Sequence, residues 1–504
     1  MRNLARAREG LETDTGHDQA RERLVREYAS IPPGSPIRLR KRTSNLFRSR
    51  ERSSGPGLDV SGLDQVLSVD PVSRTAAVQA MTTYERLVDA TLAHGLMPLV
   101  VPQLKTITIG GAVTGLGIES TSFRNGLPHE SVRELEILTG AGEIVVAYPS
   151  GENSDLFHAF PNSYGTLGYA VRLVIDLEPV HPFVRLRHVR FTSLEALSEA
   201  IEAIVATSAY DGEPVDFLDG TVFGVDDAYL TLGSWSQTAP YTSDYTGQKI
   251  YYQSIRTRDS DYLTVRDYLW RWDTDWFWCS RAFGAQNRLV RTLWPKKWLR
   301  SDVYAKLIGW ESRHQVVTRL DRWRGKPPRE RVVQDVEIPL HRTAEFLRWF
   351  LREVPVTPVW LCPLRLRGTG VTTGVTATTE LASRADLPAA ATATTTGTDL
   401  PARTDTGSQG PWPLYPLCCD QTYVNVGFWS TVPIPPERRE GEVNRRIEDA
   451  VAGHEGHKSL YSDSYYPPEE FRALYGGTTY AEVKARYDPG SRLLDLYEKA
   501  VGRR

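Results

Sequence analysis

The sequence predicts an α+β fold, and two patterns support this prediction. From about residue 38 to residue 182, short strand-like runs broken by glycine and proline follow one another with few helical segments between them. From residue 183 to about residue 366, helical and strand patterns are mixed, as in a sheet covered by helices. Repeated strand–helix–strand units are not visible, and 504 residues are enough for two or three domains.

The first region is expected to contain a sheet and one amphipathic helix at residues 83–94. A threonine at its start, Thr82 or Thr83, can cap this helix, Glu85 lies in its first turn, and Gly95 supplies the stop. A second, short helix is expected at residues 155–160. The predicted strands of this region are residues 58–60, 65–70, 75–79, 96–101, 134–138, 143–147 and 171–177, and the pair 134–138 and 143–147 forms a hairpin.

The second region is expected to form a sheet with helices on it. Helices are predicted at residues 194–206, 343–354 and 444–453, and strands at residues 215–223, 227–232, 332–338, 356–366 and 423–429. Residues 368–410 are rich in Thr, Ala and Gly and have almost no large apolar side chain. Such a segment cannot bury enough surface to offset its chain entropy, so a disordered insertion is predicted there.

Composition excludes several classes of protein. The net charge of −2 provides no overall field that would attract nucleic acid or an anionic membrane. Residues 1–28 are rich in Arg and Glu and predict neither a signal peptide nor an anchor, and no apolar run is long enough to span a bilayer. The four cysteines have no metal-ligand spacing, which predicts reduced thiols, no metal site and a cytoplasmic protein.

The most informative stretch lies at residues 102–122, shortly after a predicted strand. It places four glycines within eight residues, namely Gly110, Gly111, Gly115 and Gly117. Glycine lets backbone amides approach a diphosphate closely, and nearby hydroxyls can donate to the same anion. The spacing is neither that of a Rossmann motif nor that of a Walker loop. The segment therefore predicts a phosphate-binding loop, with a plain glycine-rich loop at a sheet edge as the alternative.

A second glycine pair follows the helix expected at residues 155–160. Gly165 and Gly168 stand in the sequence Gly-Thr-Leu-Gly, which taken alone is typical of a turn after a helix. Upstream, residues 38–50 form a basic run with a single aromatic residue, Phe47. This composition does not predict nucleic-acid binding, and positive charge there would suit a position beside a diphosphate.

Together, these glycine segments resemble the FAD-binding domain of the PCMH-type, or vanillyl-alcohol oxidase, superfamily. More narrowly, the chain resembles the Diminuto-like Δ24-sterol reductase branch, from about residue 38 to the C-terminus with the insertion as an interruption. The matching motifs are residues 116–122 (LGIESTS), 150–157 (SGENSDLF), 165–168 (GTLG), 333–336 (VQDV), 359–363 (VWLCP) and 460–465 (LYSDSY).

This resemblance implies a two-subdomain FAD-binding domain, a sheet-and-helix substrate or cap domain, and a chain end that returns to the FAD domain. The implied division is an N-terminal extension at residues 1–37, the FAD-binding domain at 38–182, the cap at 183–366, the insertion at 367–411 and the end region at 412–504. The residues placed at the cofactor are Thr106, Ile107, Thr108, Ile109, Gly110, Gly111, Ala112, Val113, Thr114, Gly115, Leu116, Gly117, Ile118, Glu119, Ser120, Gly165, Thr166 and Gly168.

Bound FAD is expected to be non-covalent. Many members of the superfamily tether the flavin through a histidine or a cysteine near the first loops. Between residues 38 and 118 the only histidine is His94, at a helix end, and the first cysteine is Cys279. NADPH is the expected electron donor by analogy with the branch. His129 and His158 are interpreted as exposed or hydrogen-bonded structural residues.

The resemblance implies reduction of a C=C bond in a sterol-like or isoprenoid lipid, a reaction that needs a proton donor. It places Tyr461 and Tyr465 near the flavin as candidate donors, with Asp463 to orient them; a strand-end aromatic pair is the alternative interpretation. Asp335 and Glu337 alternate along a predicted strand and are expected to face solvent. An alcohol or sugar oxidase of the same fold, using O₂, is the alternative function.

Residues 262–283 contain four tryptophans, which suit either an apolar, rigid substrate or ordinary core packing. Glu119 is expected either to cap a turn or to bond the cofactor's ribose. The expected partner is an apolar small molecule. Peripheral contact with a membrane remains an option, without a transmembrane segment.

Overall fold

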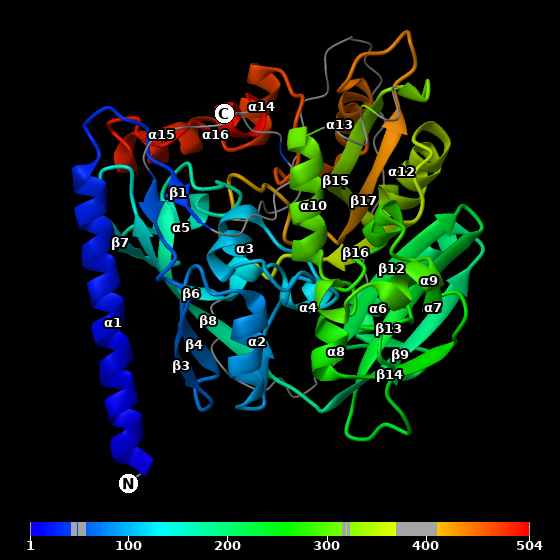
Figure 1. Cartoon of the computed structure of the whole chain (residues 1–504), viewed down its shortest axis with the longest axis horizontal. Coiled ribbons are helices and arrows are strands. Elements are labelled where there is room, and N and C mark those ends of the chain that lie inside the picture. Colours follow the sequence, from blue (N-terminus) through cyan, green and yellow to red (C-terminus); the bar gives the residue numbers. More distant parts are fainter. Residues whose placement is uncertain are drawn as a thin grey trace, which may run out of the picture.

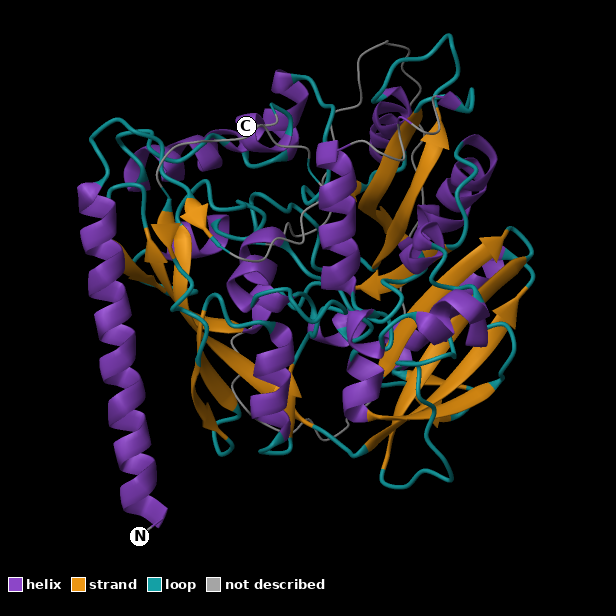
Figure 2. Cartoon of the chain, in the orientation of Figure 1, coloured by secondary structure: helices purple, strands orange, loops and turns teal. Residues whose placement is uncertain are grey.

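The computed structural model describes residues 2–41, 48, 57–314, 319, 323–368 and 411–502 (Figure 1). Most of the basic run and nearly all of the predicted insertion lie outside the described residues. Two large sheets form the body of the molecule, and Figure 2 shows them beside each other with helices around them. The α+β prediction is confirmed.

The first sheet has six antiparallel strands in the order β3-β4-β8-β6-β7, with β5 paired to β8. Helix α2 (Tyr84–Leu92) packs beside it and is capped as predicted, because the Thr83 side chain accepts from the amide of Arg86. The strands are β3 (Val66–Asp70), β4 (Thr75–Gln79), β5 (Leu96–Pro98), β6 (Val132–Leu138), β7 (Ile144–Ala147) and β8 (Tyr169–Pro179). All six were predicted, with β5 shorter than expected.

The second sheet has eight antiparallel strands in the order β14-β9-β13-β12-β16-β17-β15-β18. Strands β9, β14 and β18 were not predicted. The strands are β9 (Phe183–Phe191), β12 (Phe217–Gly224), β13 (Asp227–Ser236), β14 (Ser260–Thr264), β15 (Arg329–Pro339), β16 (Val359–Leu364), β17 (Tyr423–Pro433) and β18 (His457–Lys458).

Three predicted helices cover one face of the second sheet: α6 (Leu194–Thr207), α12 (Leu340–Glu353) and α13 (Glu442–Gly453). Their apolar faces form a core with alternate residues of the strands, such as Val332, Val336 and Ile338 of β15. The opposite face of this sheet is turned toward the first sheet. One continuous core joins the two sheets, so residues from both can contribute to a single site.

Shorter elements connect the sheets and cover their edges. They are β1 (Leu39–Arg40), β2 (Leu58–Asp59), α3 (Ile109–Gly115), α4 (Ser122–Asn125), η1 (Pro128–Ser131), α5 (Ser154–Ala159), β10 (Ala209–Tyr210), β11 (Glu213–Pro214), α7 (Tyr251–Ser254), α8 (Val265–Leu269), η2 (Cys279–Phe283), α9 (Arg288–Leu293), η3 (Lys296–Trp298) and α10 (Ser301–His314). A long helix that the sequence reading missed, α1 (Arg2–Ser30), packs Ala20, Leu24 and Tyr28 against the first sheet and β2.

The chain end returns to the first sheet, as predicted. Helices α14 (Pro468–Leu474), α15 (Gly477–Tyr487) and α16 (Leu496–Ala500) lie together, and α15 packs on α5 (Figure 1). The Lys484 ammonium donates to the carbonyl of Thr166 at 2.8 Å, and the Tyr487 hydroxyl donates to Asn153 and Asp155, both at 2.9 Å. The C-terminal segment therefore holds the turn that carries the second glycine pair.

Candidate active site

The glycine-rich segment is a helix, not the loop that was expected. Thr108 caps α3 by accepting from the amide of Gly111 at 3.2 Å. The amides of Ile109 and Gly110 donate to the carbonyls of Thr82 and Ala80, both at 2.9 Å. The cap and the contact with β4 outweigh the weak helix propensity of glycine. The amides at the start of this segment are therefore satisfied by the protein.

The glycines of this segment serve close packing. None of the four has a φ in the left-handed region. A Cβ at Gly110 would lie 2.7 Å from the Cβ and the carbonyl oxygen of Ala80, and one at Gly117 would lie 2.9 Å from Pro102. The left-handed φ of 71° falls instead on Leu116, where a side chain makes it costly by about 1–3 kcal/mol. The segment is tightly packed up to Gly115 and irregular just after it.

The structure brings the two glycine segments together through Tyr164. The Tyr164 amide donates to the Thr114 carbonyl at 2.9 Å, and its hydroxyl donates to the Gly115 carbonyl at 2.5 Å. Tyr164 has a φ of 50° and Asn162 a φ of 62°, which are rare for residues with side chains. Such backbone persists only where the surrounding contacts fix it, and it is concentrated at functional sites.

Gly165 and Gly168 belong to the turn that enters β8, with φ values of 77° and 149°. A Cβ at Gly168 would lie 2.5 Å from Ile137, so the glycine is needed for contact with β6. The Thr166 hydroxyl donates to the Ser163 carbonyl at 2.8 Å. The interpretation as a turn at the end of a helix is wrong, because the residues after α5 form a separate loop.

Arg48 brings positive charge to this junction. Within the basic run at residues 38–50, the structure describes residues 38–41 and Arg48. Arg48 is buried. Its guanidinium carbon lies 4.5 Å above the centre of the Tyr164 ring. A buried guanidinium in this position favours an anionic group nearby.

A pair of carboxyls faces the same junction from the second sheet. Asp335 and Glu337 were expected in solvent, and this was wrong, because the even-numbered residues of β15 face the helices while the odd-numbered ones face the first sheet. Glu337 is fully buried and accepts from the Ser459 hydroxyl at 2.9 Å; Asp335 is half-buried and accepts from the Asn425 amide at 3.4 Å. Gly427 leaves room for Asp335, since a Cβ there would lie 2.5 Å from its carboxylate oxygen.

The surroundings of these carboxyls favour their protonated forms. Burial raises the pKa of Asp335 from 3.8 to about 7, against the opposing effect of hydrogen bonds from Asn425 and Tyr461. Burial, and then the charge of Asp335, raise the pKa of Glu337 well above its usual value. At neutral pH this pair can therefore hold at least one proton.

Of the three predicted catalytic residues, the structure brings Tyr461 to this carboxyl pair. Its hydroxyl accepts from the Trp429 indole at 3.0 Å and hydrogen-bonds to Asp335. Asp463 lies 3.6 Å from the Arg331 guanidinium, and the amide of Tyr465 donates to Glu448 of α13 at 3.1 Å. Asp335 and Glu337 were not predicted as site residues. Their spacing of two along a predicted strand did indicate that they share one face.

Glu119 and Ser120 have hydrogen-bond partners in the second sheet region. Arg271 donates to Glu119 at 2.7 Å and to Asp219 at 2.8 Å, and all three side chains are buried. The Ser120 hydroxyl hydrogen-bonds to that of Tyr268 at 2.8 Å. These contacts link the end of the glycine segment to β12 and α8.

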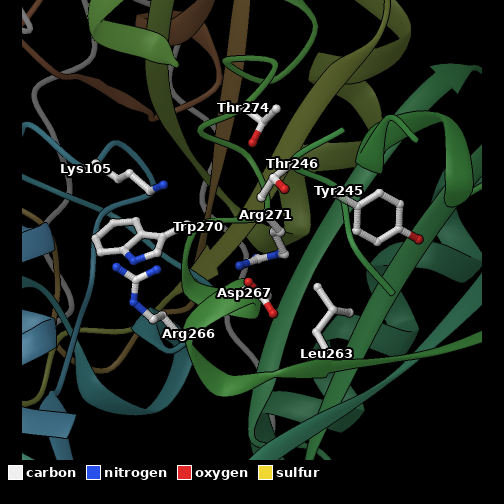
Figure 3. Close-up of a pocket in the computed structure, with 9 residues that line it drawn as sticks. All are labelled: Lys105, Tyr245, Thr246, Leu263, Arg266, Asp267, Trp270, Arg271 and Thr274. Atoms are coloured by element: carbon white, nitrogen blue, oxygen red, sulfur yellow. The ribbon is translucent and has the colours of Figure 1, made fainter. Parts of the chain in front are cut away.

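The tryptophans of residues 262–283 are core residues. Trp270, Trp272, Trp276 and Trp278 are each at most 5% exposed and pack in the core that joins the sheets, so the substrate-contact interpretation is wrong. A cavity of about 40 Å³ beside them (Figure 3) is lined by Lys105, Tyr245, Thr246, Leu263, Arg266, Asp267, Trp270, Arg271 and Thr274. It can hold a water molecule or two, but not a lipid.

The two histidines differ. His158 is half-buried and bonds the Pro149 carbonyl at 2.9 Å, which confirms its structural interpretation. His129 is buried, and neither ring nitrogen has a hydrogen-bond partner in the described part of the chain, which corrects its interpretation. Its ring lies 4.4 Å from that of Trp412, and burial lowers its pKa to about 3. His129 is therefore neutral.

Comparison with known proteins identifies the relationship. Residues 25–148 match the model of an FAD binding domain. Over 61% of its length the chain is 28% identical to the Delta(24)-sterol reductase of Arabidopsis thaliana. Over 87% it is 25% identical to a Delta(24)-sterol reductase homolog of Caenorhabditis elegans and 24% identical to the human Delta(24)-sterol reductase. The chain is thus similar over most of its length to Delta(24)-sterol reductases of plants, a worm and mammals. The matches span 56%, 77% and 76% of these proteins.

The chain thus has an FAD-binding domain of the expected type, and groups that could hold an anionic part of the cofactor lie at the C-terminal end of α3. The first-turn amides of α3 are occupied, whereas Leu116 and Gly117 are partly exposed, and Arg48 lies beside the Gly115–Tyr164 contact. Asn162 adds a buried amide oxygen that lacks a hydrogen-bond partner within the described residues. Within the described residues of this chain, no helix is long and apolar enough to cross a membrane.

Proposed function

We propose that the chain is an FAD-dependent oxidoreductase that reduces a C=C bond of a sterol-like or isoprenoid lipid, with NADPH as electron donor. The relatives whose printed name is Delta(24)-sterol reductase support this reaction class. The observation that carries the proposal is the Tyr461–Asp335–Glu337 cluster, which faces the glycine segments and can hold a proton at neutral pH.

Alkene reduction needs this combination. When bound and reduced by the electron donor, FAD would supply the hydride. An acid held close to the alkene protonates one carbon, and the positive charge that develops on the other carbon is neutralised by the hydride. Tyr461 is the proposed donor, because its hydroxyl lies between Trp429, which donates to it, and Asp335, which can replace the lost proton. Asp335 takes the orienting role that was predicted for Asp463.

The cofactor is proposed to lie along residues 113–118 and 162–166, held without a covalent bond. Arg48 would face its anionic part, and the exposed edge of Leu116 and Gly117 would lie against it. The first residues predicted to bind the cofactor, from Thr106 to Ala112, would serve mainly to fix α3 on β4. The backbone amides from Ile109 to Ala112 already have hydrogen-bond partners within the protein.

The test is anaerobic reduction of the purified protein. We expect NADPH to bleach the flavin absorbance and a Δ24-unsaturated sterol to restore it. Rapid bleaching by a polyol or another alcohol, with peroxide formed in air, would establish the oxidase alternative instead. Protein that takes up no flavin from excess FAD would contradict the cofactor assignment.

A further inference from the structure

The segment after the buried tryptophans exposes an unusual amount of apolar surface. Of the eleven large apolar side chains that are exposed in the described part of the chain, six lie between residues 289 and 323. Leu293 is 85% exposed, Leu289 78% and Trp298 51%. Two more tryptophans, Trp310 and Trp323, are exposed farther along. Single exposed apolar residues are ordinary, but a concentration of them marks an interaction surface.

Helix α9 is oriented with Arg291 inward and its leucines outward. Arg291 is buried and forms a bidentate pair with Asp275, with nitrogen–oxygen distances of 2.6 and 2.9 Å. It also donates to the carbonyl of Gly247. Leu289 and Leu293 are one turn apart and therefore share a face, which lies about 160° away from Arg291 around the helix. The buried ion pair thus fixes the leucines in their exposed position.

The segment that carries these leucines has charges of one sign. Residues 276–301 contain six lysines and arginines and no acidic residue. Arg291 and Arg300 pair with acidic residues of neighbouring elements, whereas Arg288, Lys296 and Lys297 are exposed beside the apolar side chains. We define Arg288, Leu289, Leu293, Lys296, Lys297 and Trp298 as the α9 surface.

We infer that the α9 surface docks on the surface of a lipid bilayer with anionic headgroups. Leucines can enter the boundary between headgroups and acyl chains, and a tryptophan suits that boundary because its ring is apolar and its N–H is polar. Lysines and arginines at the rim keep their charge in the headgroup layer and attract anionic lipid. The inference stands on exposure and charge and does not depend on the proposed reaction.

The test measures binding to vesicles by co-sedimentation, with phosphatidylcholine alone and with phosphatidylcholine plus phosphatidylserine. We expect binding to the anionic vesicles that weakens as salt is raised. The double variant Leu289→Ser, Leu293→Ser should lower the partition coefficient at least about tenfold, because two apolar side chains no longer enter the bilayer. Lys296→Gln with Lys297→Gln should lower it by about tenfold on anionic vesicles alone.

The matched control is Val72→Ser, which removes a 92% exposed apolar side chain from the turn between β3 and β4 and should leave binding unchanged. Equal binding of wild type and the double leucine variant would overturn the inference. It would also be overturned by a concentration-dependent dimer in sedimentation velocity that the leucine substitutions abolish, because a second copy of the chain would then cover the surface.

Discussion

The Tyr461 hydroxyl hydrogen-bonds to the Asp335 carboxyl, joining the segment after β18 to β15, the strand next to that edge of the second sheet. Trp429 of β17 donates to the same hydroxyl. Burial raises the pKa of Tyr164 in the glycine junction, and the charges of Glu337 and Asp335 add to this rise. Residues of β15, of β17 and of the segment after β18 therefore share one proton-holding cluster beside the glycine junction.

Tyr461→Phe should slow C=C reduction by about 100-fold or more, because it removes the proposed acid without changing the shape of the side chain. Steady-state turnover with NADPH and an unsaturated sterol measures this. Bound flavin, measured by absorbance, should be unchanged. Tyr465→Phe is the matched control and should keep near wild-type turnover, since the Tyr465 ring packs against Gly441 at the start of α13. A similar loss in both variants would refute the assignment of Tyr461.

The rate of C=C reduction should fall as the pH rises through about 7. Asp335 has a pKa raised to about 7, so its protonated form, the one that can return a proton to Tyr461, is present below that pH and lost above it. Glu337, also shifted upward, and Asn425 face Asp335, so the titration belongs to the coupled group. In Asp335→Asn this pH dependence should disappear from kcat while NADPH still reduces the flavin; an unchanged profile would contradict the role.

The same carboxyl should affect stability with a definite sign. Because its folded pKa lies above its unfolded value of 3.8, the folded state binds the extra proton between about pH 4 and 7. The contribution of Asp335 to the free energy of unfolding is therefore full below pH 4 and decreases as the pH rises to 7. Urea unfolding at pH 5 and pH 7.5 should show a smaller pH difference for Asp335→Asn than for wild type. An equal or larger difference would mean that the carboxyl is not shifted.

Much of the fold could be predicted from side-chain periodicity. The prediction of the site residues was wrong where periodicity carries no information. The alternation along β4 predicted residues 75–79 as found, and Thr83 marked the start of α2. Alternation along β15 also placed Asp335 and Glu337 on one face. A period of two cannot tell whether that face meets water or a second sheet, so the pair was assigned to solvent.

The helical conformation of the glycine segment was not predicted, for a different reason. A high glycine content favours a loop. The cap at Thr108, which is a local interaction, and the contact of Gly110 with Ala80, which is a tertiary one, together stabilise a helix instead. The spacing of Thr108 and Gly111 was an available signal for the cap. Arg271 as the partner of Glu119 was out of reach, since 152 residues separate them.

Gly110→Ala should destabilise the protein by about 1–3 kcal/mol and reduce flavin retention, because its Cβ would meet the Ala80 backbone and displace α3. Thermal unfolding and the ratio of flavin to protein absorbance measure the two effects. Gly453→Ala, at the end of α13, is the matched control, because no atom lies within 4 Å of its added Cβ. Full flavin content in a destabilised Gly110→Ala would separate α3 from the cofactor.

Arg271→Met should lower the free energy of unfolding by about 3–5 kcal/mol, because it leaves Glu119 and Asp219 buried without their cation. Arg266 is the matched control: it also follows β14, but its pair with Asp89 is about half exposed, so Arg266→Met should cost at most about 1 kcal/mol. Urea unfolding of both variants tests the contrast. Since Glu119 ends the glycine segment and Asp219 lies in β12, the Arg271 variant should also bind FAD more weakly, by loosening the first sheet from the second. Equal costs for the two arginines would mean that the buried network does not hold these regions together.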